Sequence, residues 1–288
     1  MRTAVITPVH GRADHLRRQL CGLRDGTRHP DLHVVVAISD DVCDVAAVGG
    51  DATRVVHCEA ANVDALPIAE ARNTGAEFAL DLGAELLVFL DVDCIPAPAM
   101  LTHYVGAATR GEHGDALLCG PVTYLPPPGE HGYPSDLAPL VDPHPDRPAP
   151  APGLIVDGTD YDLFWSLSFA LSAATWRRIG GFCTDYVGYG AEDTDFAQSA
   201  LAAEVPMRWV GGAHAFHQYH PVSDPPVEHL RDIVRNADVF HRRWGWWPMP
   251  GWLDAFEELG LIDRGADGRP IIRATLGEEH PGHRSGRV

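Results

Sequence analysis

Basic residues are scarce in this sequence. Its 288 residues include 22 Lys and Arg against 40 Asp and Glu, which gives a formal net charge of -18 at pH 7. Nucleic-acid binding depends on clustered basic side chains at the phosphates, and anionic membrane surfaces attract basic segments in the same way. The charge balance therefore disfavours both partners, and any phosphorylated ligand is expected to bind through a cation that stands between it and the protein's acids.

Long hydrophobic runs and paired cysteines are also missing. No stretch of 18 apolar residues occurs, so no transmembrane helix is expected. The apolar residues 4–9 begin too close to Met1 and end too soon at polar residues to form a signal peptide. The sequence has no C-x-x-C pair and no internal repeat. Isolated thiols favour a reduced, cytoplasmic setting, and the six cysteines stand singly at Cys21, Cys43, Cys58, Cys94, Cys119 and Cys183.

Apolar side chains are plentiful enough to form a core. Hydrophobic residues make up 45% of the chain, and a chain of this length suffices for one large α/β domain. Helical spacing predicts helices that start near Asp14 and Pro67. Apolar runs predict strands at residues 4–9, 33–38, 53–57 and 85–90. This alternation predicts an α/β fold with a mostly parallel central sheet flanked by helices, whose ligands bind beyond the carboxyl ends of the strands.

Prolines crowd residues 121–153 and interrupt the regular pattern. A loop of this length is usually functional or disordered, so two alternatives are an exposed flexible insertion and a lid over the acceptor. A long amphipathic helix is predicted at residues 227–244. We expect the main domain at residues 1–221, a helical and aromatic extension at 222–264, and a flexible tail at 265–288.

The strongest candidate site is the D-V-D motif that contains Asp91 and Asp93. It directly follows the apolar run at residues 85–90, where a buried strand is expected to end at the ligand-binding edge of the sheet. Alternation along a strand directs both carboxylates to one face, and two acids this close repel each other unless they share a cation. Oxygen ligands suit Mg²⁺ or Mn²⁺, which complete their shells with diphosphate oxygens. The alternative is a solvated turn at the strand end.

A second acidic motif, G-Y-G-A-E-D-T-D, occupies residues 188–195 and places Glu192 and Asp193 at the start of a predicted helix. The helix dipole favours negative charge at this position, so ordinary capping of the helix is one interpretation. The other is that one of the two carboxylates is a general base for an acceptor hydroxyl.

Three histidines, His214, His217 and His220, follow a strand predicted at residues 207–210. Neutral imidazole is a common ligand of transition metals, so at least one of the three is predicted to join the metal site. The H-x-x-H spacing has neither the Cys pair nor the H-E-x-x-H pattern of zinc sites. The alternative is a structural role, with the histidines hydrogen-bonded in the core.

In their order along the chain, these motifs resemble those of the GT-A glycosyltransferases. The resemblance rests on V-I-T-P-V-H-G at residues 5–11, A-R-N-T-G at residues 71–75, and the two acidic motifs. It extends over roughly residues 3 to 221, and it is greatest to family 2 enzymes and to the carboxyl-terminal galactosyltransferase domain of family 7. Family 7 enzymes have a W-G-W-G-G-E-D core, where this chain has Tyr189 and lacks the second glycine, so the choice of sugar and acceptor does not carry over.

The resemblance implies a role for each matching residue. Asp93 is expected to bind the metal directly, Asp91 to touch the metal or the ribose, and His217 or, alternatively, His220 to complete the metal shell. Asp193 matches the base of inverting enzymes, with Glu192 beside it in contact with the donor or acceptor sugar. The residues implied at the donor and nucleotide site are Thr7, Pro8, Val9, Arg12, Asp40, Arg72 and Asp91.

These observations together predict a metal-dependent, inverting glycosyltransferase of the hexosyltransferase class. It would use Mn²⁺ or Mg²⁺ and transfer a sugar from a nucleotide-diphosphate sugar, with a UDP-sugar as the expected donor, to a hydroxyl acceptor. One alternative is a sugar nucleotidyltransferase, although the H-G-R turn after the first strand is a poor phosphate loop for that reaction. A non-catalytic sugar-binding module is the other alternative.

Overall fold

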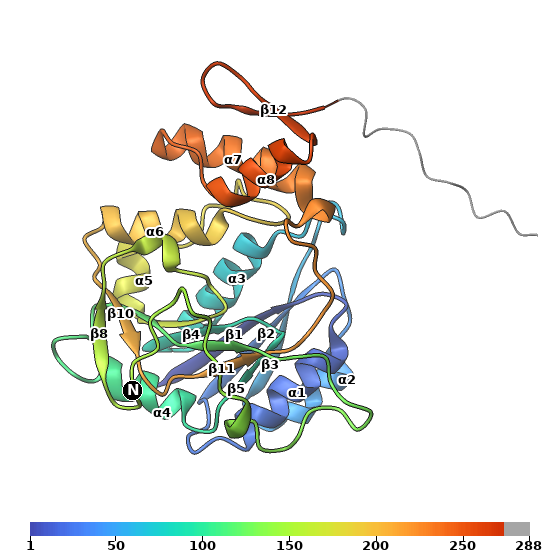
Figure 1. The fold of residues 1–288 in the computed structure, drawn as a ribbon. Helices are drawn as coiled ribbons and strands as arrows, with labels where there is room; N and C mark the ends of the chain where they lie inside the picture. The colour runs from blue at the N-terminus through green and yellow to red at the C-terminus, as the bar shows by residue number, and fades with distance from the viewer. Residues whose placement is uncertain (274–288) are drawn as a thin grey trace, which may run out of the picture. The chain divides into compact units, whose positions relative to one another are not determined.

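The computed structural model describes residues 1–273 (Figure 1). Its packing divides the chain into two compact units. The first unit consists of Met1–Gly188 and Glu192–Pro221, and the second consists of Tyr189–Ala191 and the chain from Val222 onward. None of the helices in the described part of the chain is long and apolar enough to cross a membrane.

An eight-stranded sheet forms the centre of the first unit. One half contains β1 (Thr3–Val9), β2 (Leu32–Ile38), β3 (Thr53–Cys58) and β4 (Leu86–Leu90). The other half contains β6 (Leu117–Cys119), β8 (Ile155–Gly158), β9 (Ser168–Ser172) and β10 (Met207–Val210). The strand order is β3-β2-β1-β4-β9-β6-β10-β8. The first half is fully parallel, β10 is parallel to β6, and β9 and β8 run antiparallel to their neighbours, so the expected α/β fold with a largely parallel sheet is confirmed.

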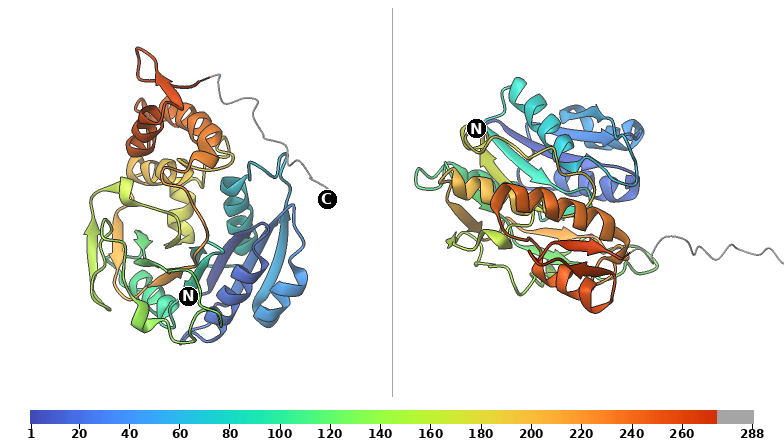
Figure 2. Two further views of the ribbon diagram at one scale, coloured as in Figure 1. Left: turned by 45° about the vertical axis from the view of Figure 1, so that its right-hand side comes forward. Right: turned by 90° about the horizontal axis from the view of Figure 1, so that it is seen from above.

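Helices cover both faces of this sheet, as the two views of Figure 2 show. On one face lie α1 (Ala13–Arg24) and α4 (Met100–Ala108). On the other lie α3 (Ile68–Asp81), α5 (Ala173–Ile179) and α6 (Glu192–Ala202). The short elements α2 (Cys43–Ala46), η1 (Ala47–Ala52) and η3 (Tyr161–Leu163) connect these layers. Successive side chains of a strand point to opposite faces. Because helices cover both faces of the sheet, every residue of β1 is buried.

Helix α3 approaches the sheet closely because residue 75 is a glycine. A Cβ atom built on Gly75 would lie 2.6 Å from a methyl group of Ile6 and 2.8 Å from one of Val36. The absence of a side chain at this position therefore sets the distance of the helix from β1 and β2. Arg72 lies one turn earlier in the same helix.

A second, three-stranded sheet was not predicted from the sequence. It contains β5 (Cys94–Pro96), β7 (Val122–Tyr124) and β11 (Ala215–His217). Strand β11 is central, antiparallel to β5 and parallel to β7. The register places His217 opposite both Cys94 and Tyr124. This small sheet therefore brings the last residue of β11 beside the residues that follow β4.

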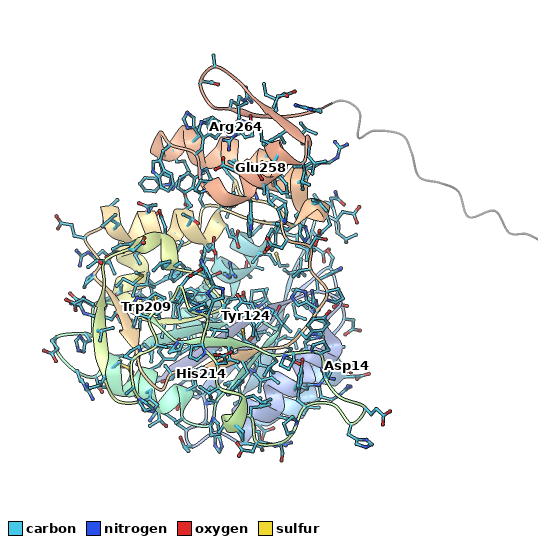
Figure 3. All side chains as sticks on the ribbon, viewed as in Figure 1. Asp14, Tyr124, Trp209, His214, Glu258 and Arg264 are labelled. Carbon is cyan, nitrogen blue, oxygen red and sulfur yellow. The ribbon has the colours of Figure 1, made fainter. Side chains whose placement is uncertain are left out.

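The Pro-rich segment at residues 121–153 contains β7 and the 3-10 helix η2 (Ala138–Leu140). Arg147 near its end is buried, and its guanidinium lies 5.0 Å from the ring centre of Trp165 and 4.8 Å from that of Trp209. Trp209, labelled in Figure 3, belongs to β10. These cation–π contacts fasten the later part of the segment to the central sheet.

The second unit has its own core. Its elements are η4 (Val227–His229), α7 (Leu230–Trp244), α8 (Pro250–Glu258), β12 (Ile262–Arg264) and β13 (Pro270–Ile272). The apolar face predicted for the helix is present, with Ile233 and Ala237 packed against Leu253 and Phe256. Strand β13 falls in the segment for which the sequence predicts a flexible tail, and residues 274–288 of that segment lie outside the described residues.

Candidate active site

Arg72 joins the two acidic motifs. Its side chain is only 3% exposed on α3, and its Nη2 donates to Asp91 Oδ1 at 2.9 Å while its Nη1 donates to Glu192 Oε1 at 3.2 Å. The face of the guanidinium lies 5.1 Å from the ring centre of Phe182. One buried cation therefore holds together two motifs that are a hundred residues apart in the sequence.

The charges around Arg72 influence one another. Burial raises the pKa of Asp91, while Arg72 opposes the rise and Asp93 adds to it. Burial and the charge of Asp193 raise the pKa of Glu192 to about 7, against the attraction of Arg72. Burial alone would lower the pKa of Arg72, but Asp91 and Glu192 raise it above its usual value. The guanidinium therefore stays charged and shares its charge between two carboxylates.

Asp193 occupies the first turn of α6 and is half-buried. Its Oδ1 accepts hydrogen bonds from the backbone N–H of Thr194 at 2.7 Å and from the Thr194 hydroxyl at 3.4 Å. Burial raises the pKa of Asp193, whereas the Thr194 N–H and Arg72 oppose the rise. The contact with Thr194 satisfies a backbone donor of the helix start. The raised pKa is the property expected of a general base that works near neutral pH.

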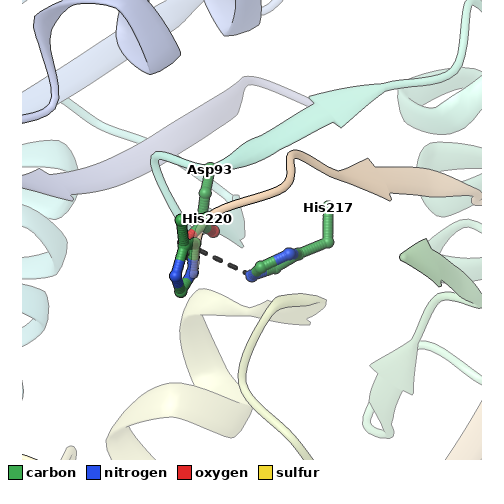
Figure 4. A group of neighbouring side chains, drawn as sticks. All are labelled: Asp93, His217 and His220. Atoms are coloured by element: carbon green, nitrogen blue, oxygen red, sulfur yellow. Dashed lines mark ion pairs between the residues drawn. The ribbon is translucent and has the colours of Figure 1, made fainter. Parts of the chain in front are cut away.

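Asp93, His217 and His220 form a group that fits a metal ion (Figure 4). The Oδ2 of Asp93 lies 3.4 Å from His217 Nε2 and 3.6 Å from His220 Nε2, and the possible ligand atoms all lie within 4.8 Å of one another. Burial would raise the pKa of Asp93, but the two histidines beside its carboxylate hold it well below its usual value. One carboxylate and two imidazoles suit a transition metal such as Mn²⁺ better than Mg²⁺, which prefers oxygen ligands throughout.

Two residues implicated by the sequence stand outside this group. His214, labelled in Figure 3, is buried, and its Nε2 lies 2.9 Å from the Thr123 hydroxyl. Burial lowers the pKa of His214 to about 4, and its contact with Thr123 agrees with the structural alternative that the sequence left open. Asp91 directs its Oδ1 to Arg72 rather than towards the histidines.

Buried glutamines hold the metal group in place. Gln19 Nε2 donates to the backbone oxygens of Asp91 at 2.7 Å and Cys94 at 3.1 Å, so α1 fixes the loop that carries Asp93. The backbone N–H of Gln218 donates to the Asp93 carbonyl at 2.7 Å, which fixes the loop between the two histidines. Neither glutamine was singled out from the sequence, because their partners are backbone carbonyls of distant segments and leave no pattern.

The residues expected at the nucleotide site end the first two strands. Thr7 is fully buried, and its hydroxyl donates to Gln19 Oε1 at 2.8 Å and lies 3.0 Å from His33 Nε2. Pro8 and Val9 are buried beside it in β1, and Arg12 is partly exposed at the start of α1. Asp40 Oδ2 accepts from the N–H of Gly11 at 2.8 Å, which ties the turn after β1 to the end of β2. The side chain of Thr7 therefore supports the D-V-D loop through Gln19.

The sequence of this chain is similar to those of known glycosyltransferases. The family model for the N-terminal domain of galactosyltransferase matches residues 158–221. Two curated relatives, both validoxylamine A glucosyltransferases, come from Streptomyces hygroscopicus subsp. jinggangensis (strain 5008) and Streptomyces hygroscopicus subsp. limoneus. Each is 29% identical over an alignment of 269 residues, and the match covers 83% of this chain. The chain spans 60% and 56% of the length of these relatives.

Solved structures of low sequence identity superpose on most of this chain. S. aureus TarS (residues 1–349) superposes with a TM-score of 0.56 at 14% identity, over 84% of this chain and 66% of that chain. GalNAc-T7 with UDP, GalNAc and Mn²⁺ gives a TM-score of 0.52 at 12% identity, over 76% of this chain and 43% of that chain. The chain has the GT-A glycosyltransferase fold. The resemblance drawn from the motifs is thus confirmed at the level of the fold. The D-V-D motif follows β4, Glu192 and Asp193 begin α6, and His217 ends β11.

Proposed function

We propose that this chain is a metal-dependent glycosyltransferase that moves a hexose from a UDP-sugar to a hydroxyl group of an acceptor, with inversion at the anomeric carbon. The observation that supports the proposal is that two groups of side chains lie together at the ends of β4 and β11. One is the metal-fitting group of Asp93, His217 and His220, and the other is the pair of acids joined by Arg72. The match to the galactosyltransferase family model supports the same reaction.

The metal group would serve the departing nucleotide. Asp93, His217 and His220 would hold Mn²⁺ in preference to Mg²⁺, because two of the three ligands are imidazole nitrogens. A bound divalent cation would supply Lewis-acid stabilisation of the diphosphate as its bond to the sugar breaks. Arg72 orients Asp91 beside this group, and its hydrogen bond goes to Asp91 rather than to Asp93.

Asp193 would act on the acceptor. Its carboxylate would take the proton of the acceptor hydroxyl as the oxygen attacks the anomeric carbon, and the bond from that carbon to the diphosphate would break on the opposite side. The products are the glycoside, UDP and a protonated Asp193, which returns its proton to solvent. The raised pKa of Asp193 fits this exchange, because a base is most effective when its pKa lies near the working pH.

The names of the relatives suggest where to begin. Both curated relatives are named for glucosyl transfer to validoxylamine A, and one structural neighbour contains UDP together with Mn²⁺. UDP-glucose with Mn²⁺ is therefore the first donor mixture to test, and validoxylamine A is the first acceptor. Release of UDP together with a new glycoside would establish glycosyl transfer, and NMR of the new anomeric centre would establish inversion. Pyrophosphate formed from UTP and a sugar phosphate would instead establish nucleotidyl transfer and contradict the proposal.

The variant Asp193→Asn separates catalysis from helix capping. Asn caps a helix about as well as Asp, so the free energy of unfolding should change little. The rate of sugar transfer should fall by roughly a hundredfold or more, the usual contribution of a positioned base, while UDP affinity with Mn²⁺ should be kept. The matched control is Asp14→Asn, which changes an exposed acid in the first turn of α1 and should leave the rate unchanged. A nearly normal rate in Asp193→Asn would make Glu192 the next candidate for the base.

A further inference from the structure

One side of α1 carries an unusual set of basic side chains. Arg12, His15 and Arg18 follow one another at intervals of three residues, a spacing that puts them on the same side of a helix. The sequence contains no lysine, so arginine and histidine are its only basic side chains. In a chain with a net charge of -18, three such groups on one helix face need an explanation.

The charges on this face are held in place but not neutralised. Arg18 Nη1 donates to the neutral Oε1 of Gln218 at 3.1 Å, and its guanidinium lies 6.0 Å from the ring centre of Tyr133. Within residues 1–273 neither Arg12 nor Arg18 forms an ion pair. The exposed Arg17 of the same helix behaves in the ordinary way and pairs with Asp14 at 2.7 Å.

His15 adds a buried polar atom without a partner. Its Nε2 is buried and makes no hydrogen bond with any other described residue. Burial and the charge of Arg12 lower the pKa of His15, against the attraction of Asp93. A neutral imidazole with a free ring nitrogen can donate one hydrogen bond to an anionic oxygen. A buried polar atom of this kind is normally satisfied by a protein, water or ligand partner.

Gln218 joins this face to the metal group. Its Nε2 donates to the His15 carbonyl at 3.2 Å, and its backbone N–H donates to the Asp93 carbonyl at 2.7 Å. The charge of Arg12 acts on His217, and that of His220 acts on His15. The three basic groups of α1 and the metal-fitting group are therefore neighbours, and Gln218 links His15 and Arg18 to the metal-fitting group.

The charges of these neighbouring groups indicate what kind of ligand would fit them. A divalent cation on the group would exceed the single negative charge of Asp93, and Arg12 and Arg18 would add further positive charge. The natural complement is a compact polyanion that also binds the metal. The diphosphate of the proposed donor has this chemistry, and it gains negative charge as it leaves the sugar.

We propose that Arg12, His15 and Arg18 form a diphosphate-binding face, on which the phosphates of the nucleotide donor lie between α1 and the metal. The proposal rests on the proposed function and deepens it, since it assigns His15 and Arg18 to the leaving group. The charge of Arg18, already oriented by Gln218 and Tyr133, stabilises the developing negative charge without having to reorganise.

Calorimetric titration of the whole chain in excess Mn²⁺, with UDP and with UMP as ligands, tests this assignment. Arg18→Met should weaken UDP binding about tenfold or more, as expected for the loss of a hydrogen bond between charged groups. His15→Gln should weaken it in the same direction, and both variants should change UMP affinity much less than UDP affinity. Arg17→Met is the matched control and should bind UDP like the wild type, because Arg17 is exposed and paired with Asp14.

Every other outcome contradicts either the diphosphate-binding face alone or the proposed function as well. Unchanged UDP affinity in Arg18→Met and His15→Gln would overturn the diphosphate-binding face and leave the proposed function intact. Equal losses for UDP and UMP would also overturn it, since the two residues would then contact another part of the nucleotide. Failure of the wild-type chain to bind UDP with Mn²⁺ would overturn the proposed function and this inference with it. Thermal unfolding of each variant shows whether a loss of affinity comes from a loss of fold.

Discussion

Replacement of Arg72 by methionine removes the one buried cation that joins the two acidic motifs, while it keeps most of the side-chain volume. The two carboxylates that Arg72 contacts are themselves largely buried, with Asp91 24% and Glu192 14% exposed. Removal of one partner from a buried ion pair typically costs roughly 3–5 kcal/mol, because the remaining charge is left without compensation. The partial exposure of Asp91 allows some solvation, so we expect a loss of about 3 kcal/mol at neutral pH.

The size of this loss should depend on pH in a definite direction. Burial and Asp193 already raise the pKa of Glu192 to about 7 in the presence of Arg72, and without the guanidinium it should rise further. A carboxyl whose pKa is higher in the folded state binds more protons there than in the unfolded chain. Its stabilising effect is complete below the unfolded pKa of about 4.3 and is lost as the pH rises through the folded pKa. The deficit of Arg72→Met should therefore be smallest near pH 5 and larger near pH 8.

Urea unfolding followed by tryptophan fluorescence at about pH 5 and about pH 8 measures both effects. Arg54→Met is the matched control, since Arg54 is exposed on β3 and contacts only the nearby backbone; it should change the free energy of unfolding by less than about 0.5 kcal/mol. Adding Glu192→Gln to Arg72→Met should recover part of the stability at the higher pH. A loss below about 1 kcal/mol, or one that does not change with pH, would refute the reasoning about the shared cation.

Two further predictions concern the metal and the packing of α3. His217→Ala and His220→Ala should each weaken Mn²⁺ binding in calorimetric titration by roughly tenfold or more, whereas His214→Ala should leave it unchanged, because His214 bonds to Thr123; a normal Mn²⁺ affinity in both of the first two variants would remove histidine from the site. Gly75→Ala should cost roughly 1–3 kcal/mol in urea unfolding, because the new Cβ meets Ile6 and Val36. Gly106→Ala on α4, where a Cβ meets nothing within 4 Å, should not destabilise the fold, and equal behaviour of the two alanine variants would contradict the packing argument.

The part of the fold that sequence predicts best is the parallel half of the central sheet. Strands β1, β2 and β4 are largely apolar runs that remain buried on both faces, and such runs carry a strong local signal. Strands β5, β7 and β11 have three residues each, too few for any periodicity to show. Their pairing is decided by contacts between distant segments, and it is this pairing that places His217 opposite Cys94.

Some features of the candidate site could likewise be predicted from the sequence, and others could not. The acids of the two motifs were found from sequence because carboxylates at a strand end and at a helix start are themselves a pattern. The pairing of Arg72 with Asp91 and Glu192 could not be derived, since it depends on how closely α3 packs on the sheet. Sequence also left open which of the downstream histidines face Asp93. The loop held by Gln218 brings both His217 and His220 to it.

The charges of the site are compatible with the proposed binding of a diphosphate by an acidic chain. Arg72 compensates Asp91 and Glu192, and it does so from within the fold and without any ligand. Asp93 is the acid left for an external cation, and the two histidines beside it add metal affinity but no negative charge. Once that cation is bound, the region between it and α1 is positive, although the chain as a whole is negative. Under the proposed function, the anionic donor would be attracted to this one region and repelled elsewhere, so we expect the metal to bind before the nucleotide.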